Sequence, residues 1–457
     1  MKKLNYIFIS YDGIAYPVAY KLLKEGRTVL IGQLQDIKEL KEKDDKPEKP
    51  VVKKRRLESY KGVFLHKMTM LELISTCAKI KDKDNWFVMC DFNNLWHYAE
   101  VFQKMGFTKG LFPTKEDYEG EMDRQKSKEL VKKEYPGLTV APVTEFKKVP
   151  DGIQHMTENP DMHFVLKGNA DQASTICPTS EHPILSAQEV ISELEKDPKI
   201  YEQSGFILEE KIMKSYEMTP EMVFYDGKPV MATVDIENKN MGAGSNEGYQ
   251  IGCSQNLVIR IDIESPICKI AFPDYIYKKA KQHKGVFVTD AGLMCKDGQF
   301  YFTEFCSQRF GYDSFFTELA MCDSVSDFFE SLVKGENPLK KKYGAAVRGL
   351  NLKKDDDRWS AGEMNMSWLD EEDKNIWVYD MKKKDGKTVN VGSGDDLAVF
   401  TGSADDIKTA VNKAYTARKA FSFSGVYSRP KEDFMSTAYL SSIPNRFGYA
   451  KDNQLFR

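Results

Sequence analysis

The stretch FYFTEFCSQRFGYDS, Phe300–Ser314, decides the fold and the function that this chain is expected to have. It runs apolar and aromatic up to Thr303, which predicts a strand, and then places an acid at Glu304. Five residues later it places an arginine, Arg309, and two positions beyond that a glycine, Gly311. A strand that ends by presenting a carboxylate indicates a bound cation, so Glu304 and Arg309 mark the candidate site.

The composition predicts a globular protein of several parts. The chain has 457 residues, too many for one ordinary core, which predicts two to four subdomains. Hydrophobic residues make up 41% and charged residues 30%, as in folded soluble proteins. Lys+Arg 66 against Asp+Glu 69 leaves a formal charge of -3. Nucleic acid and membrane are therefore not expected as partners, although a local basic groove stays open.

Cysteine and histidine usage gives no disulfide or zinc pattern. The 8 cysteines contain no CxxC pair and most lie in apolar runs, which indicates reduced, buried thiols. The 6 histidines show no zinc-type spacing. The apolar run at the N-terminus is broken at Asp12, and no later stretch is long enough to span a bilayer. A cytoplasmic protein is therefore expected.

The order of helix and strand signals divides the chain into units. Residues 1–114 begin with strand, helix and strand patterns at 6–10, 11–26 and 27–33, which predicts an N-terminal domain with a parallel α/β layer. Within it, residues 38–56 are charged, aperiodic and proline-bearing. They are expected to form a solvated loop, a nucleic-acid contact being the alternative.

Residues 115–338 are expected to form the domain that carries the chemistry. Residues 115–137 predict one connector helix ended by Pro136-Gly137, and Tyr225-Asp226-Gly227-Lys228 predicts a hairpin. Residues 339–434 form a third, C-terminal unit, and residues 435–457 a tail that is expected to be a surface arm. The short strands of the middle unit are expected at 163–168, 205–212, 221–236, 285–294 and 299–305.

Charged residues at the ends of these strands indicate a nucleotide site. Lys167 ends a strand and precedes the small, polar segment 168–182, which can close over a phosphate as a lid. Taken alone, such a lysine is more simply an exposed strand end. Glu209 and Glu210 end the next strand and Glu217 follows. Acids beside a nucleotide can accept hydrogen bonds from the adenine amino group or the ribose hydroxyls. The alternative is that these acids are solvent-exposed residues that cap the ends of the strands.

Glu304 completes this pattern, because a bound triphosphate brings Mg²⁺. Magnesium prefers one or two carboxylates together with phosphate oxygens and water. A carboxylate at the end of a strand, facing Lys167, is the arrangement expected of such a site. Arg309 is a rigid fork of five donors that suits a carboxylate or a phosphate. Its alternative is a salt bridge to Asp313 or Glu318.

The order of these motifs resembles the ATP-grasp fold and, within it, the phosphoribosylamine–glycine ligase family. The resemblance covers nearly the whole chain, and residues 377–434 are similar to the C-terminal domain of that family, which other ATP-grasp enzymes do not share. It implies an α/β protein with an N-terminal Rossmann-like preATP-grasp domain, an ATP-grasp domain and a small C-terminal α+β domain. It also implies ATP and Mg²⁺ as cofactors.

The resemblance implies roles for individual residues. Lys167 would be catalytic and contact the ATP phosphates, and Arg309 would be catalytic and lie beside the acceptor. Glu304 would bind the metal. ATP would be held at Arg124, Lys128, Lys167, Glu209, Glu210 and Glu217, with Glu209 and Glu210 at the adenine and Glu217 at the ribose.

Three departures from the family pattern bear on the chemistry. Cys306 stands where the family has a metal-binding asparagine, and cysteine is a poor magnesium ligand. Either Ser307 or Gln308 takes that place, or metal binding is weakened. The lid has a single glycine, Gly168, where the family is glycine-rich. Residues 11–17, YDGIAYP, replace the family's Gly-Gly-Arg-Glu-His stretch after the first strand, which puts phosphoribosylamine in doubt.

The function implied is an ATP-dependent carboxylate–amine ligase, as in purine biosynthesis or nucleotide modification. It would join an amino acid, glycine being the family's choice, to an amine through an acyl phosphate. The amine is phosphoribosylamine or another amine on a nucleotide-like molecule. A catalytically altered ATP-binding protein and an ATP-grasp phosphoryl transferase are the alternatives. The partners expected are small molecules, and the chain is a monomer or a homodimer.

Overall fold

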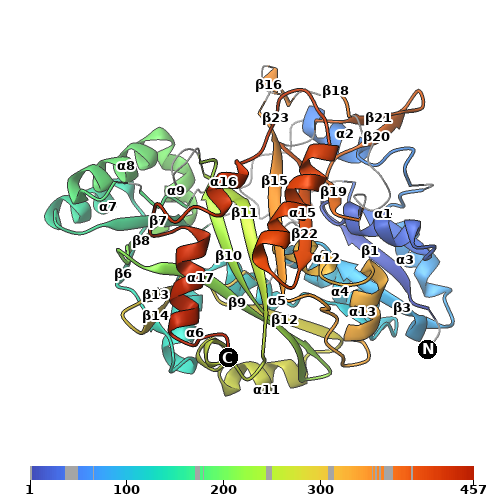
Figure 1. The fold of residues 1–457 in the computed structure, drawn as a ribbon, viewed down its shortest axis with the longest axis horizontal. Helices are drawn as coiled ribbons and strands as arrows, with labels where there is room; N and C mark the ends of the chain where they lie inside the picture. The colour runs from blue at the N-terminus through green and yellow to red at the C-terminus, as the bar shows by residue number, and fades with distance from the viewer. Residues whose placement is uncertain are drawn as a thin grey trace.

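The structure is a computed structural model that describes most of the chain. The described residues are 3–35, 50–64, 66–169, 175–178, 180–242, 250–306, 313–352, 354–355, 358–359, 362–364, 374–392 and 395–457. One large sheet crosses the molecule and smaller sheets and helices surround it (Figure 1). Along the large sheet the strands follow the order β19-β22-β15-β11-β10-β9-β12-β4-β3-β1-β2.

The N-terminal part supplies the parallel end of this sheet. β1 pairs in parallel with both β2 and β3, and β3 pairs in parallel with β4. Every residue of β3 is buried, as expected for a parallel strand covered on both faces. The predicted parallel layer is confirmed. Its elements are β1 (Asn5–Ser10), α1 (Tyr16–Lys24), β2 (Val29–Gln33), α2 (Pro50–Glu58), α3 (Met70–Ala78), β3 (Trp86–Cys90), α4 (Trp96–Lys104) and β4 (Gly110–Leu111).

A second sheet has three strands in the spatial order β6-β8-β7, and it packs with three helices into its own small core. In Figure 1 it forms a lobe beside the large sheet. Two short helices lead into it. The elements are α5 (Lys115–Met122), α6 (Arg124–Glu134), β5 (Thr139–Val140), β6 (Val143–Phe146), α7 (Val149–Glu158), β7 (Phe164–Gly168), α8 (Pro183–Lys196), α9 (Pro198–Ser204) and β8 (Phe206–Glu210).

The middle of the large sheet is antiparallel and carries the longest strands. β12 joins it to the parallel end, because β12 pairs in parallel with β4 and antiparallel with β9. The elements are β9 (Tyr216–Tyr225), β10 (Lys228–Asn240), β11 (Gln250–Ile261), α10 (Pro266–Ala271), α11 (Asp274–Gln282), β12 (Val286–Asp290), β13 (Leu293–Lys296), β14 (Gln299–Phe302), α12 (Asp313–Ala320) and α13 (Val325–Leu332).

The C-terminal part extends the same sheet. β15 pairs with β11 on one side and with β22 on the other. Two small sheets, β16-β17 and β18-β21-β20, lie apart from it. The elements are β15 (Tyr343–Asn351), β16 (Lys354–Asp355), β17 (Arg358–Trp359), β18 (Gly362–Glu363), β19 (Ile376–Val378), β20 (Lys382–Lys384), β21 (Lys387–Asn390), β22 (Asp396–Ala404), α15 (Ile407–Ala420), β23 (Val426–Tyr427), α16 (Lys431–Phe434) and α17 (Ile443–Asp452).

The hairpin predicted between β9 and β10 is confirmed. Tyr225 pairs with Lys228, and the two residues between them, Asp226 and Gly227, have φ of 48° and 75°. Positive φ at both central positions is the geometry of a type I′ turn, which matches the twist of the two strands.

Two expectations about irregular or continuous segments are wrong. The charged segment 38–56 was expected to be a loop, and its part from Pro50 forms helix α2, in which Arg56 is buried; residues 38–49 lie outside the described residues. The connector was expected to be one helix, and it is two. Asp123 ends α5 and caps α6, because its side chain accepts a hydrogen bond from the backbone of Lys126 at 2.9 Å.

The tail is not a surface arm. Its residues form helix α17, in which Ile443, Arg446 and Ala450 are buried. Apolar and polar groups of the tail thus pack on the strands of the large sheet, and α17 contacts β9 and β10. The predicted domain boundaries at 114, 338 and 434 remain predictions. None of the helices in the described part of the chain has both the length and the apolar character needed to cross a membrane.

Candidate active site

The site is built where the small sheet faces the large one. Arg124 and Lys128 lie four residues apart, on one face of α6. Lys167 and Glu209 lie on one face of the small sheet: Val165 is paired with Glu209, and Lys167 is two residues beyond Val165 on the same strand. The large sheet contributes Glu217 from β9, Lys239 from β10 and Glu304 from the segment after β14.

A buried carboxylate joins two lysines at the centre of the site. Lys128 Nζ lies 2.9 Å from one oxygen of Glu209, and Lys167 Nζ lies 2.9 Å from the other. All three side chains are buried. Lys167 also donates a hydrogen bond of 3.2 Å to the carbonyl of Thr303, the residue before Glu304. Burial, and then the neighbouring ammonium of Lys167, lowers the pKa of Lys128 to about 8.

A second ion pair joins α6 to the segment after β14. Arg124 Nη1 lies 2.8 Å from Glu304 Oε2, and about a fifth to a quarter of each side chain is exposed (19% and 27%). Burial opposes the charge on Glu304, but Arg124, Lys167, Lys239 and Lys128 together outweigh it and bring the pKa of this carboxyl down to about 2. Glu304 is therefore ionised at every pH at which the protein would be studied.

A third ion pair lies on the large sheet. Lys239 Nζ of β10 lies 2.5 Å from Glu217 Oε1 of β9. Burial is outweighed by Glu217, Glu237 and Glu304, so the pKa of Lys239 is raised, and the pKa of Glu217 is lowered against its own burial by Lys239. Both groups are charged at neutral pH.

The charges of this site favour a polyanion. The cations Arg124, Lys128, Lys167 and Lys239 outnumber the carboxylates Glu209, Glu217 and Glu304 among these ion pairs. A cluster with more cations than anions in a partly buried setting attracts phosphate groups, whose oxygens accept charge-assisted hydrogen bonds from lysine and arginine. The residues present therefore fit the triphosphate of ATP.

Several predicted positions do not join this cluster. Glu210 follows Glu209 on β8, so its side chain points to the opposite face of the small sheet. Ser307 and Arg309 lie outside the described residues, as does Gln308. Their predicted roles at the metal and at the acceptor remain predictions.

The residue that replaces the family's asparagine is described, and its side chain suits a metal poorly. The backbone N–H of Cys306 donates a hydrogen bond of 2.6 Å to Asp290 Oδ1. Burial, followed by the charges of Glu304 and Asp290, raises the pKa of the Cys306 thiol, so the thiol stays protonated. Burial also raises the pKa of Asp290 well above its usual range.

Glu304 is thus the ionised carboxylate that fits one magnesium ligand here. Among the described residues, no group of three or more histidine, cysteine, aspartate or glutamate side chains is arranged to hold a metal ion. A magnesium ion bound mainly by phosphate oxygens and water needs only one or two protein carboxylates, so the residues fit Mg²⁺ when it arrives with a nucleotide.

Sequence reasoning missed Lys239, Asp290 and Arg446. The signal for Lys239 was present, because Asp235, Glu237 and Lys239 alternate along β10 and therefore share one face. Arg446 gave no local signal. It comes from the tail, is buried, and donates hydrogen bonds of 2.7 Å to the carbonyl of Glu237 and 3.0 Å to Asn238 Oδ1.

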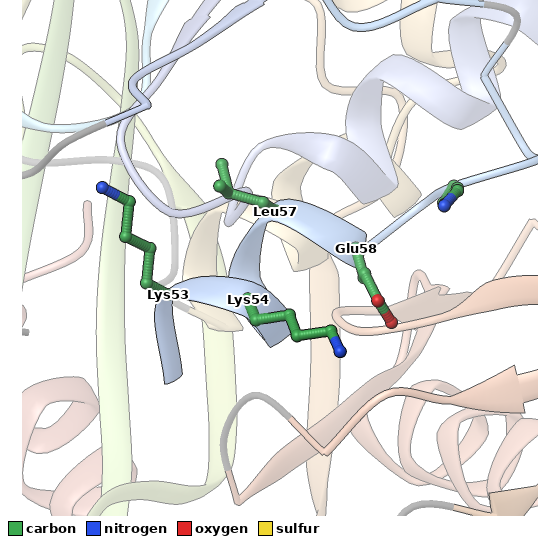
Figure 2. Close-up of a pocket in the computed structure, with 5 residues that line it drawn as sticks. Lys53, Lys54, Leu57 and Glu58 are labelled. Atoms are coloured by element: carbon green, nitrogen blue, oxygen red, sulfur yellow. The ribbon is translucent and has the colours of Figure 1, made fainter. Parts of the chain in front are cut away.

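A hollow on α2 is a weaker candidate. Figure 2 shows it with Lys53, Lys54, Leu57 and Glu58 labelled, and its volume is about 530 Å³. Lys53 and Lys54 extend to opposite sides of the helix, so their ammonium groups do not converge on one anion (Figure 2). Glu58 is already paired with Lys382, at 2.5 Å.

Comparisons with known proteins bear on the fold. No protein-family model and no curated protein sequence matches the chain. Phosphoribosylamine–glycine ligase from Thermotoga maritima superposes with a TM-score of 0.64 at 15% identity, over 93% of this chain and 99% of that one. A second match is the biotin carboxylase domain of 2-oxoglutarate carboxylase from Hydrogenobacter thermophilus, in complex with MgADP. Its TM-score is 0.56 at 12% sequence identity, over 94% of this chain and 92% of that one.

A third match is biotin carboxylase from Campylobacter jejuni in an ATP complex, with a TM-score of 0.57 at 12% identity over 94% of both chains. These are ATP-grasp enzymes, and each superposition covers more than nine tenths of this chain. The α/β architecture predicted from the sequence is confirmed: this chain has the ATP-grasp fold.

Proposed function

We propose that the protein is an ATP-dependent, ADP-forming ligase that joins a carboxylate to an amine. One observation carries the proposal. Lys128 and Lys167 converge on Glu209 at 2.9 Å each, and Arg124 meets Glu304 at 2.8 Å, so three cations and the candidate metal-binding carboxylate are brought together by these ion pairs. The similarity in fold to ATP-binding ligases supports the same class of reaction.

In this proposal the cations bind the nucleotide. Lys167 and Lys128 release Glu209 in part and donate to phosphate oxygens, and Arg124 donates to the phosphate next to Glu304. Glu217 and Lys239 lie on the large sheet, where Glu217 accepts from the ribose hydroxyls. Glu304 is the side chain that would hold Mg²⁺, which would offset the charge of the phosphate groups.

The reaction is two displacements. A carboxylate oxygen of the amino acid attacks the terminal phosphorus of ATP, a P–O bond forms, and the bond to ADP breaks. The amine nitrogen then attacks the carbonyl carbon of the acyl phosphate, a C–N bond forms, and inorganic phosphate leaves while the nitrogen loses a proton. The work of the protein is to position the reactants and to stabilise the charge on the phosphoryl group.

We propose glycine as the amino acid, following the family that the sequence resembles. The position of Asp12 bears on whether the amine substrate carries a phosphate. It follows β1, where the family has a Gly-Gly-Arg-Glu-His stretch, and Asp91 lies beside it. Two carboxyl groups at this position favour an amine that carries no phosphate there.

Cys306 favours a second candidate, an ATP-binding protein without turnover. Its protonated thiol stands where a magnesium-binding amide is expected, and a site short of one ligand can bind a nucleotide and fail to transfer its phosphoryl group. A phosphoryl transferase that needs no amine is the third possibility.

ADP release separates these functions. The ligase requires the amino acid, the amine and Mg·ATP together. Release of ADP with one substrate alone, together with a stable phosphorylated product, identifies the transferase. A Tm raised by Mg·ATP without ADP release in any mixture of glycine and amines identifies the binding protein and contradicts the ligase.

A further inference from the structure

A pocket of about 420 Å³ lies on the far side of helix α6 from the nucleotide site. It is lined by residues of α5, α6, α11 and β12, together with Tyr135 and Phe305. α6 and α11 lie near one another at the bottom of Figure 1. The volume is within the range of pockets that bind small molecules, and none of its lining residues takes part in the ion pairs of the candidate active site.

The pocket and the nucleotide site share two structural elements. Helix α6 turns Arg124 and Lys128 toward Glu304 and Glu209, and turns Ser127 and Leu130 into the pocket. The second shared element is the segment after β14. Glu304 pairs with Arg124, and the next residue, Phe305, lines the pocket.

The lining of the pocket combines four aromatic rings with charges that balance. Tyr135 lies between two other rings, with centroids 6.1 Å from Tyr275 and 5.7 Å from Phe305. Lys279 is paired with Asp117 at 2.8 Å. The rings favour a flat, aromatic guest, because rings stack on rings. The guest is expected to be neutral, because the charged lining residues are three acids and three lysines, namely Glu116, Asp117, Glu129, Lys126, Lys133 and Lys279.

Two hydroxyl-bearing side chains give the lining a polar component. Tyr135 is 3% exposed and Thr289 is 6% exposed, and both line the pocket. Each hydroxyl can donate or accept a hydrogen bond, so a guest that carries a ring nitrogen or an N–H group can make a polar contact as well as ring contacts.

We propose that this pocket is a second ligand site, which takes a neutral, planar heteroaromatic molecule and changes the affinity of the nucleotide site through α6 and Phe305. A guest that moves Leu130 or Phe305 moves the backbone that carries Arg124 and Glu304. The binding itself does not depend on the proposed function, whereas the effect on the nucleotide rests on the ATP site proposed above.

Gly120 provides a matched pair of variants. It lies within α5, lines the pocket, and a Cβ built on it meets no atom within 4 Å. The Cβ of a tryptophan at position 120 therefore meets no neighbouring atom, and Gly120→Trp is expected to fill the pocket with its indole ring. Gly120→Ala also replaces the glycine within the helix, with a gain in helix propensity of about 1 kcal/mol, and does not fill the pocket.

The first experiment measures binding of three neutral probes, indole, benzimidazole and quinazoline, by titration calorimetry and ligand-observed NMR. At least one probe is expected to bind with a Kd below about 1 mM, to bind Gly120→Ala equally, and to bind Gly120→Trp at least tenfold more weakly. Tyr135→Phe is expected to weaken a hydrogen-bonding probe several-fold and to leave toluene unaffected. No binding by any probe, or equal binding to Gly120→Trp, would overturn the proposal.

The second experiment measures the Kd of Mg·ATP with and without the bound probe. Linkage requires that the probe change the Kd of ATP by the same factor by which ATP changes the Kd of the probe. A reciprocal change of at least twofold is expected, and two independent affinities would overturn the coupling. The wild-type protein separates the two proposals: a probe that binds it while Mg·ATP does not leaves the pocket standing and removes the proposed function.

Discussion

Arg124 and Glu304 form an ion pair of 2.8 Å between residues that are far apart in the sequence. Arg124 is the first residue of α6, and Glu304 follows the last strand before the C-terminal part, so this pair ties the helix to the end of β14. The same carboxylate is the candidate metal ligand. A nucleotide that brings Mg²⁺ therefore competes with Arg124 for Glu304, and its phosphates compensate Arg124.

Glu304→Gln is expected to abolish turnover and to leave the protein folded, because the side chain keeps its shape and loses its charge. The pKa of Glu304 falls from 4.5 to about 2 in the fold. A carboxyl group whose pKa is lowered by folding stabilises the folded state at pH values above its unfolded-state pKa, and this stability is lost as pH falls through its folded-state pKa. Urea unfolding should therefore give a free energy of unfolding that differs between wild type and variant by a constant amount above about pH 5. This difference should shrink toward pH 3. A difference that grows toward pH 3 would contradict the ion pair.

Lys167→Ala is expected to weaken Mg·ATP binding about 10- to 150-fold, since a hydrogen bond to a charged group contributes about 1.5–3 kcal/mol. Folding should survive, because Lys128 remains on Glu209. Lys126→Ala is the matched control: it removes an exposed lysine of α6 that pairs with Glu119 and faces away from Glu209. The measurement is the Kd of Mg·ATP by calorimetry. An equal loss of Mg·ATP affinity in the two variants would show that Lys167 does not contact the nucleotide.

The sequence predicted the strands of the site better than its contacts. Glu304, Lys167 and Glu209 could be found because each stands at the end of an apolar strand, where a charge breaks the pattern. Which charges meet could not be read locally. Lys167 and Glu209 are partners because β7 and β8 are antiparallel neighbours in this register, and register depends on packing against the rest of the lobe.

The tail shows the same limit more strongly. Its helix is short and polar, with no apolar stripe long enough to predict burial, yet Arg446 is held between the carbonyl of Glu237 and the side chain of Asn238. These acceptors lie at the end of β10, more than two hundred residues away in the chain. A buried arginine in a polar segment is therefore visible only once the sheet that receives it is in place.

Asp290→Asn is expected to stabilise the protein, and more so at pH 8 than at pH 5. Burial raises the pKa of Asp290, so the folded state keeps a proton that the unfolded state releases, and stability falls as pH rises above the unfolded pKa. Asparagine removes this cost and still accepts the hydrogen bond from Cys306. The measurement is Tm across pH, with Asp297→Asn, in an exposed turn, as control. If the increase in Tm caused by Asp290→Asn does not grow with pH, Asp290 is not protonated in the folded protein.

Phosphoribosylamine is expected to be a poor substrate because three backbone N–H groups of the turn after β1 already donate to side chains of the protein. The backbone N–H groups that follow a strand and precede a helix commonly bind phosphate. Here the N–H of Tyr11 donates to Asp91 Oδ1 at 2.8 Å, that of Gly13 to Ser10 Oγ at 2.8 Å, and that of Ile14 to Asp12 Oδ1 at 3.1 Å. The side chains of Asp91, Ser10 and Asp12 thus accept the hydrogen bonds that phosphate oxygens would otherwise accept.

A direct assay decides this point. Phosphoribosylamine is generated in the reaction mixture with glycine and Mg·ATP, and glycinamide ribonucleotide is measured by mass spectrometry. The phosphoribosylamine–glycine ligase from Thermotoga maritima, which superposes on this chain, serves as the positive control under the same conditions. The kcat/KM of this protein is expected to be lower by at least a factor of a hundred, because a phosphate that enters the turn must displace Asp12 and Asp91 from the backbone and lie beside their carboxyl groups. A rate within tenfold of the control would show that the substrate phosphate is bound elsewhere, and would place this chain among the enzymes that form glycinamide ribonucleotide.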